Sequence, residues 1–180
     1  MFHIIQANDS NWKEIPKLVD QSFEYFTRGV VLVEGCREVT VELKDKKIKT
    51  VEQNFLGTGR NGTFWYESGE GNTFASEEKY KKSGGTEGWQ KEKNIECLEK
   101  SFWDSISLEA KQYAADLECE CEYLENINNN RILDYLCPET PWISKPYAYF
   151  GLWGTHFSWH IEDMDLYSIN ILTRGAPKVW

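Results

Sequence analysis

The pattern of apolar positions predicts a chain that begins with a helix and continues into strands. Apolar residues from Trp12 to Phe26 recur at spacings of three and four, which predicts an amphipathic helix over residues 9–26 with Ser10 as its N-cap. The apolar run 29–33 predicts a buried strand, and the alternation over 38–44 predicts a second strand.

The central part of the chain predicts loops and short helices, and the last third predicts strands. Residues 57–88 are rich in Gly, Asn, Ser, Thr and Glu, which favours loops around one short strand at 63–66 and a short helix at 76–82. The spacing of Ile95, Leu98 and Phe102 indicates a packed segment over 92–102, and residues 124–136 favour a helix. Aromatic and β-branched residues dominate 147–171, so the predicted fold class is α+β.

Composition and charge narrow the class of protein. The 180 residues are 41% hydrophobic and 14% aromatic, which predicts a folded core and excludes a disordered chain. The net charge of −9 argues against a protein that binds phosphate backbones with its whole surface. No apolar run reaches the length of a membrane span, no signal peptide begins the chain, and an odd count of five cysteines favours a reducing compartment.

Three motifs have simpler interpretations than a functional site. Residues 57–62 match G-x-G-x-x-G, but the strand predicted at 63–66 stands where a dinucleotide site needs a helix, so we interpret them as a glycine turn. The basic run 44–49 is typical of a solvated turn rather than a targeting signal. Residues 118–121 contain two cysteines without a second pair at zinc-finger spacing, so structural zinc is not expected from them.

His160-Ile-Glu162 is the motif with the strongest chemical implication. On a strand, these two side chains leave the same face, and an imidazole with a carboxylate is two thirds of the facial triad that holds non-haem Fe(II). Asn170 shares a face with Ser168 on the next segment, and Lys178 follows a turn from which it could meet a ligand carboxylate. The alternative is that Glu162 and Lys178 are only surface charges.

The chain also resembles a known family. Residues 145–172, with WHIEDMDLYSIN at 159–170, and 175–180, GAPKVW, resemble the JmjC domain of histone lysine demethylases, in particular the lysine-specific demethylase 4 subfamily. Residues 98–103 and 112–116 resemble the segment that precedes the barrel in that subfamily. The resemblance implies a double-stranded β-helix, a cupin-like barrel preceded by helices and loops, with a degenerate JmjN-like segment at 1–50, a linker with loops at 51–100, and the N-terminal part of the JmjC domain at 101–180.

The resemblance implies a role for each matching residue. His160 and Glu162 correspond to the first two Fe(II) ligands, and Tyr149 corresponds to a contact with the methylated lysine. The residues that correspond to the 2-oxoglutarate pocket are Tyr113, Phe157, Asn170, Lys178 and Trp180. Gly154 and His156 depart from the family pattern, which leaves peptide choice open.

The implied activity is Fe(II)- and 2-oxoglutarate-dependent demethylation of methylated lysine on histone H3, in the nucleus, with release of succinate, CO₂ and formaldehyde. The implied partners are the histone H3 tail and chromatin, and neither membrane binding nor sequence-specific nucleic-acid binding is expected. Two alternatives remain open: a non-catalytic interaction protein derived from a JmjC domain, and a JmjC protein hydroxylase. The methylation state and the lysine that is recognised are also open.

The chain does not supply a complete triad. Its histidines are His3, His156 and His160, and His156 would lie roughly 13 Å from His160 on an extended strand. The family takes its third iron ligand, and its zinc ligands, from later segments. We therefore expect this chain to carry the first part of an incomplete barrel and, in isolation, to bind iron weakly.

Overall fold

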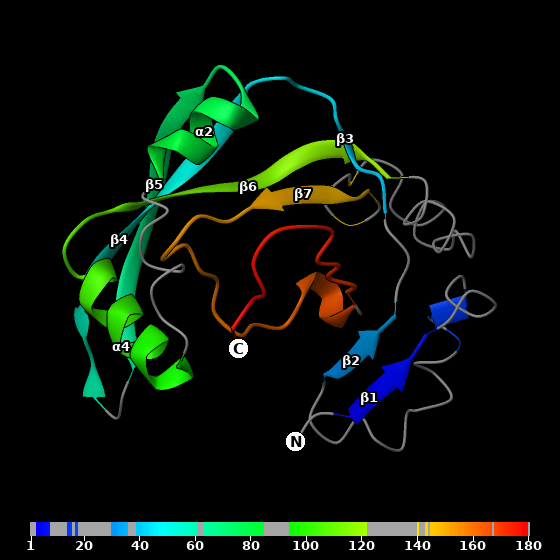
Figure 1. Cartoon of the computed structure of the whole chain (residues 1–180), viewed down its shortest axis with the longest axis horizontal. Coiled ribbons are helices and arrows are strands. Elements are labelled where there is room, and N and C mark those ends of the chain that lie inside the picture. Colours follow the sequence, from blue (N-terminus) through cyan, green and yellow to red (C-terminus); the bar gives the residue numbers. More distant parts are fainter. Residues whose placement is uncertain are drawn as a thin grey trace. The chain divides into compact units, whose positions relative to one another are not determined.

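The computed structural model describes most of the chain and divides it into two compact units. Unit 1 comprises residues 1–42, 120–146 and 162–180, and unit 2 comprises residues 43–119 and 147–161. The described residues are 3–7, 14–15, 17, 30–35, 39–60, 63–84, 94–121, 140, 143, 145–166 and 168–179. The elements, labelled in Figure 1, are β1 (His3–Gln6), β2 (Val31–Glu34), β3 (Glu42–Leu43), β4 (Ile48–Thr58), β5 (Phe64–Phe74), α2 (Glu77–Ser83), α4 (Ile95–Ile106), β6 (Lys111–Glu120), β7 (Tyr147–Phe150) and the 3-10 turn η4 (Asp163–Asp165).

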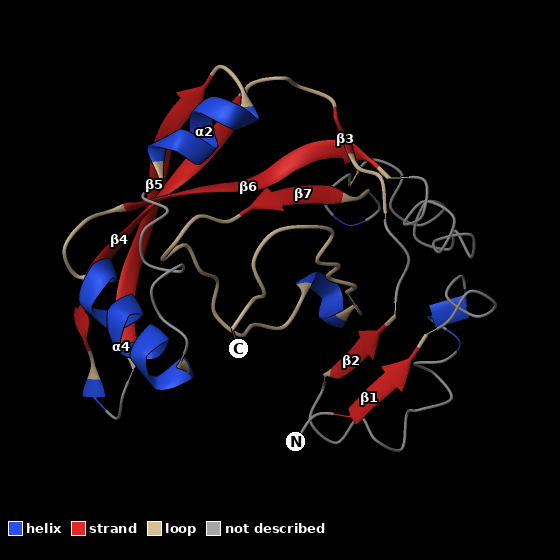
Figure 2. Cartoon of the chain, in the orientation of Figure 1, coloured by secondary structure: helices blue, strands red, loops and turns tan. Residues whose placement is uncertain are grey.

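Unit 2 is organised around a five-stranded sheet in the order β3-β6-β4-β5, with β7 paired to β6 (Figure 2). The long strands β4 and β5 form an antiparallel hairpin whose register runs from Ile48↔Phe74 to Thr58↔Phe64. The predicted glycine turn lies at the tip of this hairpin, where a strand and not a helix follows. Of residues 57–62, Gly57 and Thr58 end β4, and the strand β5, not a helix, begins at Phe64.

The core of unit 2 forms where α2 covers one end of the hairpin. Ile48, Tyr80 and Ala114 are buried, and the Tyr80 ring lies 5.3 Å from that of Phe74. The Tyr80 hydroxyl accepts a hydrogen bond from the Ala114 N–H (3.2 Å) and lies 2.7 Å from the Phe150 carbonyl oxygen, to which it donates. One phenol therefore joins α2, β6 and β7.

The two helices of unit 2 each begin at a capping side chain. The Ser76 side chain accepts from the Lys79 N–H at the start of α2, which confirms the short helix expected at 76–82. Asn94 caps α4, whose buried face carries Leu98 and Ile106. Ile95, expected to pack, is instead exposed in the first turn of α4.

Unit 1 contains a parallel pair of short strands and a small apolar cluster. β1 and β2 pair in the register His3↔Val31 to Gln6↔Glu34, and β2 confirms a strand close to the predicted 29–33. The buried cluster is formed by Ile15, Val39 and Cys121, with Val33, Val41 and Ile171 packed against it. Most of the helix expected at 9–26 and all of the helix expected at 124–136 lie outside the described residues.

The prediction of loops around a short strand at 63–66 was wrong over residues 67–74, because β5 continues to Phe74, and at 57–58, where β4 ends. Two glycines, Gly69 and Gly71, lie within β5, where low strand propensity suggested a loop. At Gly71 the close approach of β4 accounts for the glycine, because a Cβ there would lie 2.7 Å from the Thr50 carbonyl oxygen. Pairing with β4 along the whole hairpin outweighs the local propensity.

Strands are also shorter than predicted at two places. The strand expected at 38–44 is reduced to Glu42–Leu43 among its described residues. In 147–171, the described residues form a strand only in β7, so His160 and Glu162 do not lie on a regular strand. Strands persist only with hydrogen-bonded partners, and no described segment pairs with residues 151–162.

The part of the chain that the structure describes includes no helix that is long and apolar enough to cross a membrane.

Candidate functional site

The segment that carries the predicted iron ligands is held to the sheet of unit 2 by Gln53. Gln53, in the middle of β4, is only 6% exposed. Its Nε2 donates to the His156 carbonyl oxygen at 2.6 Å, and its Oε1 accepts from the His156 N–H at 3.2 Å. A carboxamide that both donates to and accepts from one residue replaces a strand pair, so it fixes the backbone immediately before Phe157 and His160.

The His156 ring lies in an aromatic enclosure. Its ring centroid is 5.1 Å from that of Tyr66 and 5.8 Å from those of Phe64 and Phe102, all at steep angles. Nδ1 lies 3.2 Å from the Gly154 carbonyl oxygen. Nε2 is buried and has no hydrogen-bond partner among the described residues. The ring therefore acts here as a packed aromatic group that joins α4 to the hairpin.

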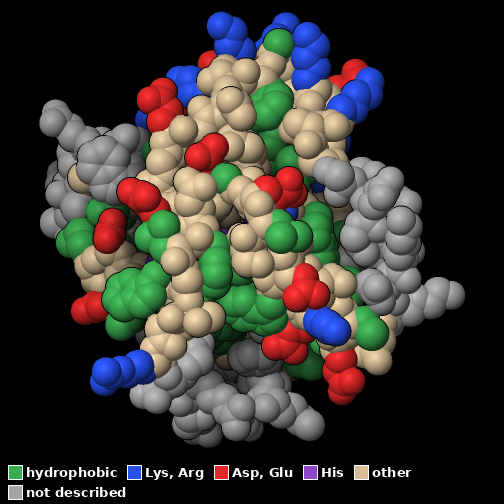
Figure 3. All heavy atoms as spheres, turned by 90° about the vertical axis from the view of Figure 1, so that its left-hand side faces the viewer, with side chains coloured by type: hydrophobic (Ala, Val, Ile, Leu, Met, Phe, Trp, Pro, Cys, Tyr) green, Lys and Arg blue, Asp and Glu red, His purple; other side chains and the backbone are tan. Residues whose placement is uncertain are grey.

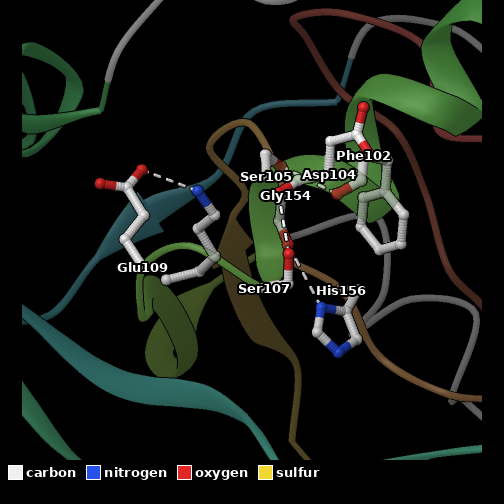
Figure 4. A network of polar contacts seen from close by, with 8 residues as sticks. Phe102, Asp104, Ser105, Ser107, Glu109, Gly154 and His156 are labelled. Carbon is white, nitrogen blue, oxygen red and sulfur yellow. Dashed lines mark hydrogen bonds and ion pairs between the residues drawn. The ribbon is translucent and has the colours of Figure 1, made fainter. Parts of the chain in front are cut away.

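The side chain of Lys111 packs against Gly154. Figure 4 shows Gly154 near His156, whose Nδ1 lies 3.2 Å from the Gly154 carbonyl oxygen. The Lys111 Nζ lies 2.8 Å from Glu109 Oε1, and its stem fills the space beside Gly154, where a Cβ would lie 2.7 Å from Lys111 Cε. With a φ of +83°, Gly154 also adopts a conformation that favours glycine. These contacts give a physical reason for both departures from the family pattern, Gly154 and His156.

Tyr113 and Tyr149 lie together on β6 and β7. Tyr113 is 7% exposed, and burial, with a smaller effect of the Asp116 charge, raises its pKa to about 12. The ring of Tyr149 lies 6.2 Å from that of Tyr113, and its hydroxyl donates to Asp116 Oδ1 at 2.7 Å. Tyr113 is therefore a neutral hydrogen-bonding group at physiological pH, and Tyr149 presents a partly exposed aromatic ring beside a carboxylate.

Asp116 reaches Tyr149 because the strand pairing is irregular at that point. The register between β6 and β7 shifts between Ala114 and Leu117, and Asp116 has a φ of +54°. A bulge of this kind redirects the side chain of the extra residue. Asp116 was not singled out by sequence reasoning, since bulges leave no reliable pattern in a single sequence.

Phe157 and His160 lie close together at the end of unit 2. Their ring centroids are 6.3 Å apart and nearly perpendicular. His160 Nδ1 lies 2.8 Å from the Ser158 carbonyl oxygen. Because a carbonyl oxygen only accepts, this hydrogen bond places the proton of the neutral ring on Nδ1 and its lone pair on Nε2. That tautomer is the one that can ligate a metal through Nε2.

Glu162 begins the last segment of unit 1. Its backbone is extended, with φ −65° and ψ 157°, and its carbonyl oxygen accepts from the Asp165 N–H at 3.1 Å as η4 begins. Its side chain is exposed. The 3-10 turn therefore fixes the backbone of Glu162 while the carboxylate remains accessible to solvent.

Asn170 and Lys178 form a direct pair in unit 1. Lys178 Nζ donates to Asn170 Oδ1 at 2.7 Å, and the partial desolvation of the ammonium lowers its pKa. Asn170 is exposed, whereas the adjacent Ile171 packs against the core cluster of unit 1. Ile169, which would share the face of Ile171 on a strand, is 42% exposed, so this segment does not present one polar face and one packed face. The amide and the ammonium together form a patch suited to a carboxylate.

The structure brings the predicted site residues together in pairs. Tyr113 lies with Tyr149, Phe157 with His160, and Asn170 with Lys178. Trp180 lies outside the described residues. Within the described ranges, no three His, Cys, Asp or Glu side chains form a group that could hold a metal ion.

Comparison with known proteins matches the segment that carries most of these residues to a protein family. Residues 147–180 match the family model described as "JmjC domain, hydroxylase". The chain is 41% identical over 96 residues to lysine-specific demethylase 4B of Mus musculus, and 37% identical over 98 residues to lysine-specific demethylase 4D of Rattus norvegicus. It is also 41% identical over 96 residues to the probable lysine-specific demethylase 4F of Homo sapiens.

Each of these three matches covers 48% of this chain, and the matched parts are 9%, 19% and 15% of the respective relatives. The JmjC match begins at Tyr147, the first residue of β7, and includes both His160 and Lys178. The chain therefore carries a JmjC-type sequence at 147–180 and resembles the lysine-specific demethylase 4 proteins over about half of its length.

Proposed function

We propose that this chain contributes part of the active site of an Fe(II)- and 2-oxoglutarate-dependent demethylase that acts on methylated lysine of histone H3 in the nucleus. The observation that carries the proposal is the JmjC match, because residues 147–180 contain every predicted site residue except Tyr113. The names of the relatives, which are lysine-specific demethylases, support the same class of reaction. The fold implied is the first part of a double-stranded β-helix.

The donor groups present fit part of an Fe(II) site. In the neutral tautomer of His160 with its proton on Nδ1, Nε2 is the atom suited to bind a metal, and Glu162 supplies an exposed carboxylate. A bound Fe(II) would supply activation of O₂ for oxidation of the N-methyl group. The protein's part is to fix the imidazole tautomer through the Ser158 carbonyl oxygen, and the backbone that precedes His160 through the two hydrogen bonds between Gln53 and His156.

The fit to 2-oxoglutarate rests on two groups of residues. Lys178 with Asn170 offers an ammonium and an amide to one carboxylate, and desolvation lowers the pKa of Lys178. Tyr113, a buried phenol whose pKa is raised to about 12, offers a hydroxyl donor. Phe157 and Trp180 are the proposed apolar walls, and zinc is not expected to bind to this part of the protein.

The methylated lysine is proposed to lie against Tyr149. Its ring is 46% exposed, and its hydroxyl oxygen lies beside the Asp116 carboxylate. An aromatic face with nearby oxygen atoms is suited to a methylated ammonium ion. A basic histone tail is the proposed partner, and chromatin is the proposed location of the reaction.

The direct test measures formaldehyde and succinate released from trimethyl-lysine histone H3 peptides by the protein expressed from its complete coding sequence, with Fe(II) and 2-oxoglutarate. The His160→Ala variant should lose at least about 100-fold in activity, in the range expected for loss of a catalytic group. His3→Ala is the matched control, since it also removes an imidazole, and it should retain activity. Equal release from wild type and His160→Ala would refute the role of His160 as a ligand.

Two alternatives are separated by the same assay. The matched family model carries the word hydroxylase, which favours a protein hydroxylase as the second candidate. A hydroxylase releases succinate and leaves an added oxygen on the peptide without formaldehyde, which mass spectrometry detects. Absence of both products with the intact peptide, while the protein remains folded, would favour the non-catalytic interaction protein.

A further inference from the structure

The basic run at residues 44–49, interpreted from sequence as a solvated turn, lies beside a second basic segment in unit 2. Ile48 lies between Lys47 and Lys49, and it pairs with Phe74, whose ring lies 5.3 Å from the ring of Tyr80. Ile48 and Tyr80 belong to the same buried cluster. Because Tyr80 lies between Lys79 and Lys81 in α2, this buried cluster brings the two lysine-rich segments together.

The charge balance of this region is opposite to that of the whole chain. Residues 44–49 and 77–83 together contain seven lysines and three acidic residues, for a local charge of 7 − 3 = +4, while the chain carries −9. Figure 3 shows blue Lys and Arg side chains gathered at the upper end of the face that it presents. The chain as a whole is acidic, but the surface formed by these two segments is basic.

Several of these lysines are not neutralised by the acidic residues nearby. Ion pairs join Lys81 to Glu77, Lys82 to Glu78, and Lys44 to Glu118. The ammonium groups of the four other lysines have no ion-pair partner among the residues that the structure describes. These four exposed residues, which we name the lysine patch, are Lys46, Lys47, Lys49 and Lys79.

We propose that the lysine patch binds the phosphate backbone of duplex DNA without reading its sequence. Unpaired, exposed lysines release condensed counterions when they meet phosphates, and this effect supplies most of the affinity of non-specific DNA binding. The patch contains none of the predicted iron and 2-oxoglutarate residues, so the interaction is separable from the proposed demethylation. On a chromatin substrate it would add DNA binding to recognition of the histone tail.

Charge and burial favour DNA over an anionic membrane as the partner. Helices that lie on membranes place exposed aromatic or aliphatic side chains beside their lysines, so that these insert between the lipids. In residues 44–49 and 77–83 the apolar side chains are Ile48 and Tyr80, and both are 0% exposed. The patch thus offers ammonium groups without any apolar side chain to insert.

The test measures binding of a fluorescein-labelled duplex of about 20 base pairs by fluorescence anisotropy, at salt concentrations from about 50 to 200 mM. The variant Lys46→Gln/Lys47→Gln/Lys79→Gln should weaken binding at least about tenfold at the lowest salt. It should also reduce the slope of log K against log salt by roughly two to three, since each phosphate that is no longer neutralised removes about 0.9 from the slope. A duplex of scrambled sequence should bind equally well.

The matched control is Lys17→Gln/Lys100→Gln/Lys145→Gln, which removes the same charge from exposed positions outside the patch. It should keep the wild-type affinity and slope, and circular dichroism should show that both variants are folded. The proposal is overturned if the wild type does not bind DNA at low salt, or if the control variant binds DNA as weakly as the patch variant. Binding to phosphatidylserine vesicles without binding to DNA would also overturn it.

Discussion

Gln53 forms two hydrogen bonds with the backbone of His156, although 103 residues separate them in the sequence. A side chain of β4 thereby provides the two backbone hydrogen bonds that a neighbouring strand would otherwise give to the irregular segment around His156. These two bonds anchor the backbone that leads into the predicted iron-binding motif to the sheet of unit 2. Their removal should therefore affect both stability and any ligand binding by His160.

Gln53→Ala should lower the free energy of unfolding by about 1–3 kcal/mol, because it leaves partly buried backbone groups of His156 without these partners. Urea unfolding followed by tryptophan fluorescence measures the change. Gln6→Ala is the control, since Gln6 is an exposed glutamine whose side chain donates a hydrogen bond to Glu34. It should change the value by less than about 0.5 kcal/mol. Similar decreases in both variants would contradict the anchoring role.

Gly154→Ala should destabilise the protein by about 1–3 kcal/mol, since it combines a φ of +83° with an approach of 2.7 Å between the new Cβ and Lys111 Cε. Gly69→Ala is the matched control within unit 2. At Gly69 nothing lies within 4 Å of an added Cβ, and the backbone is not left-handed. Thermal unfolding should show a lower midpoint for the first variant and an unchanged or higher midpoint for the second.

Stability should fall in alkaline solution between about pH 10 and 12. Burial raises the pKa of both Tyr80 and Tyr113 from 10 to about 12. In this range the unfolded chain has lost the phenolic protons that the folded chain retains, so the free energy of unfolding decreases as pH rises. The variant Tyr80→Phe/Tyr113→Phe should show a shallower decrease in urea unfolding between these pH values. An equally steep decrease in the variant would exclude the two phenols as the cause.

Asp116→Asn should lower the pKa of Tyr113, because the Asp116 charge contributes to raising it, although burial is the larger cause. Asparagine also tolerates the positive φ at this position. Absorbance at 295 nm during alkaline titration follows phenolate formation, and Tyr113→Phe identifies the signal of Tyr113. An unchanged titration of Tyr113 in Asp116→Asn would show that the carboxylate has no electrostatic effect on that phenol.

Local signals in the sequence predicted the elements that depend on neighbouring residues. The short helix expected at 76–82 corresponds to α2, and Leu98, expected to pack, is buried in α4. The glycine turn was recognised because a strand pattern follows it. Each of these inferences rests on residues that lie only a few positions apart.

Elements that depend on distant partners were not predictable in the same way. β5 contains Gly69 and polar residues, and it exists because β4 pairs with it from Phe64 to Phe74, with two register shifts. Residues 158–162 have a strand-like composition, yet no described segment pairs with them. Gln53 and Asp116 gave no signal, since their roles depend on a partner 103 residues away and on a bulge.

The contact between Lys111 and Gly154 should constrain how these two positions change among related sequences. Because the lysine stem occupies the space where a side chain at 154 would begin, the two positions are not independent. Related sequences that carry a larger residue at 154 should carry a shorter one at 111, and neither substitution should be accepted readily without the other. The two positions should therefore covary among relatives, so that a larger side chain at the loop position 154 accompanies a smaller one at the strand position 111.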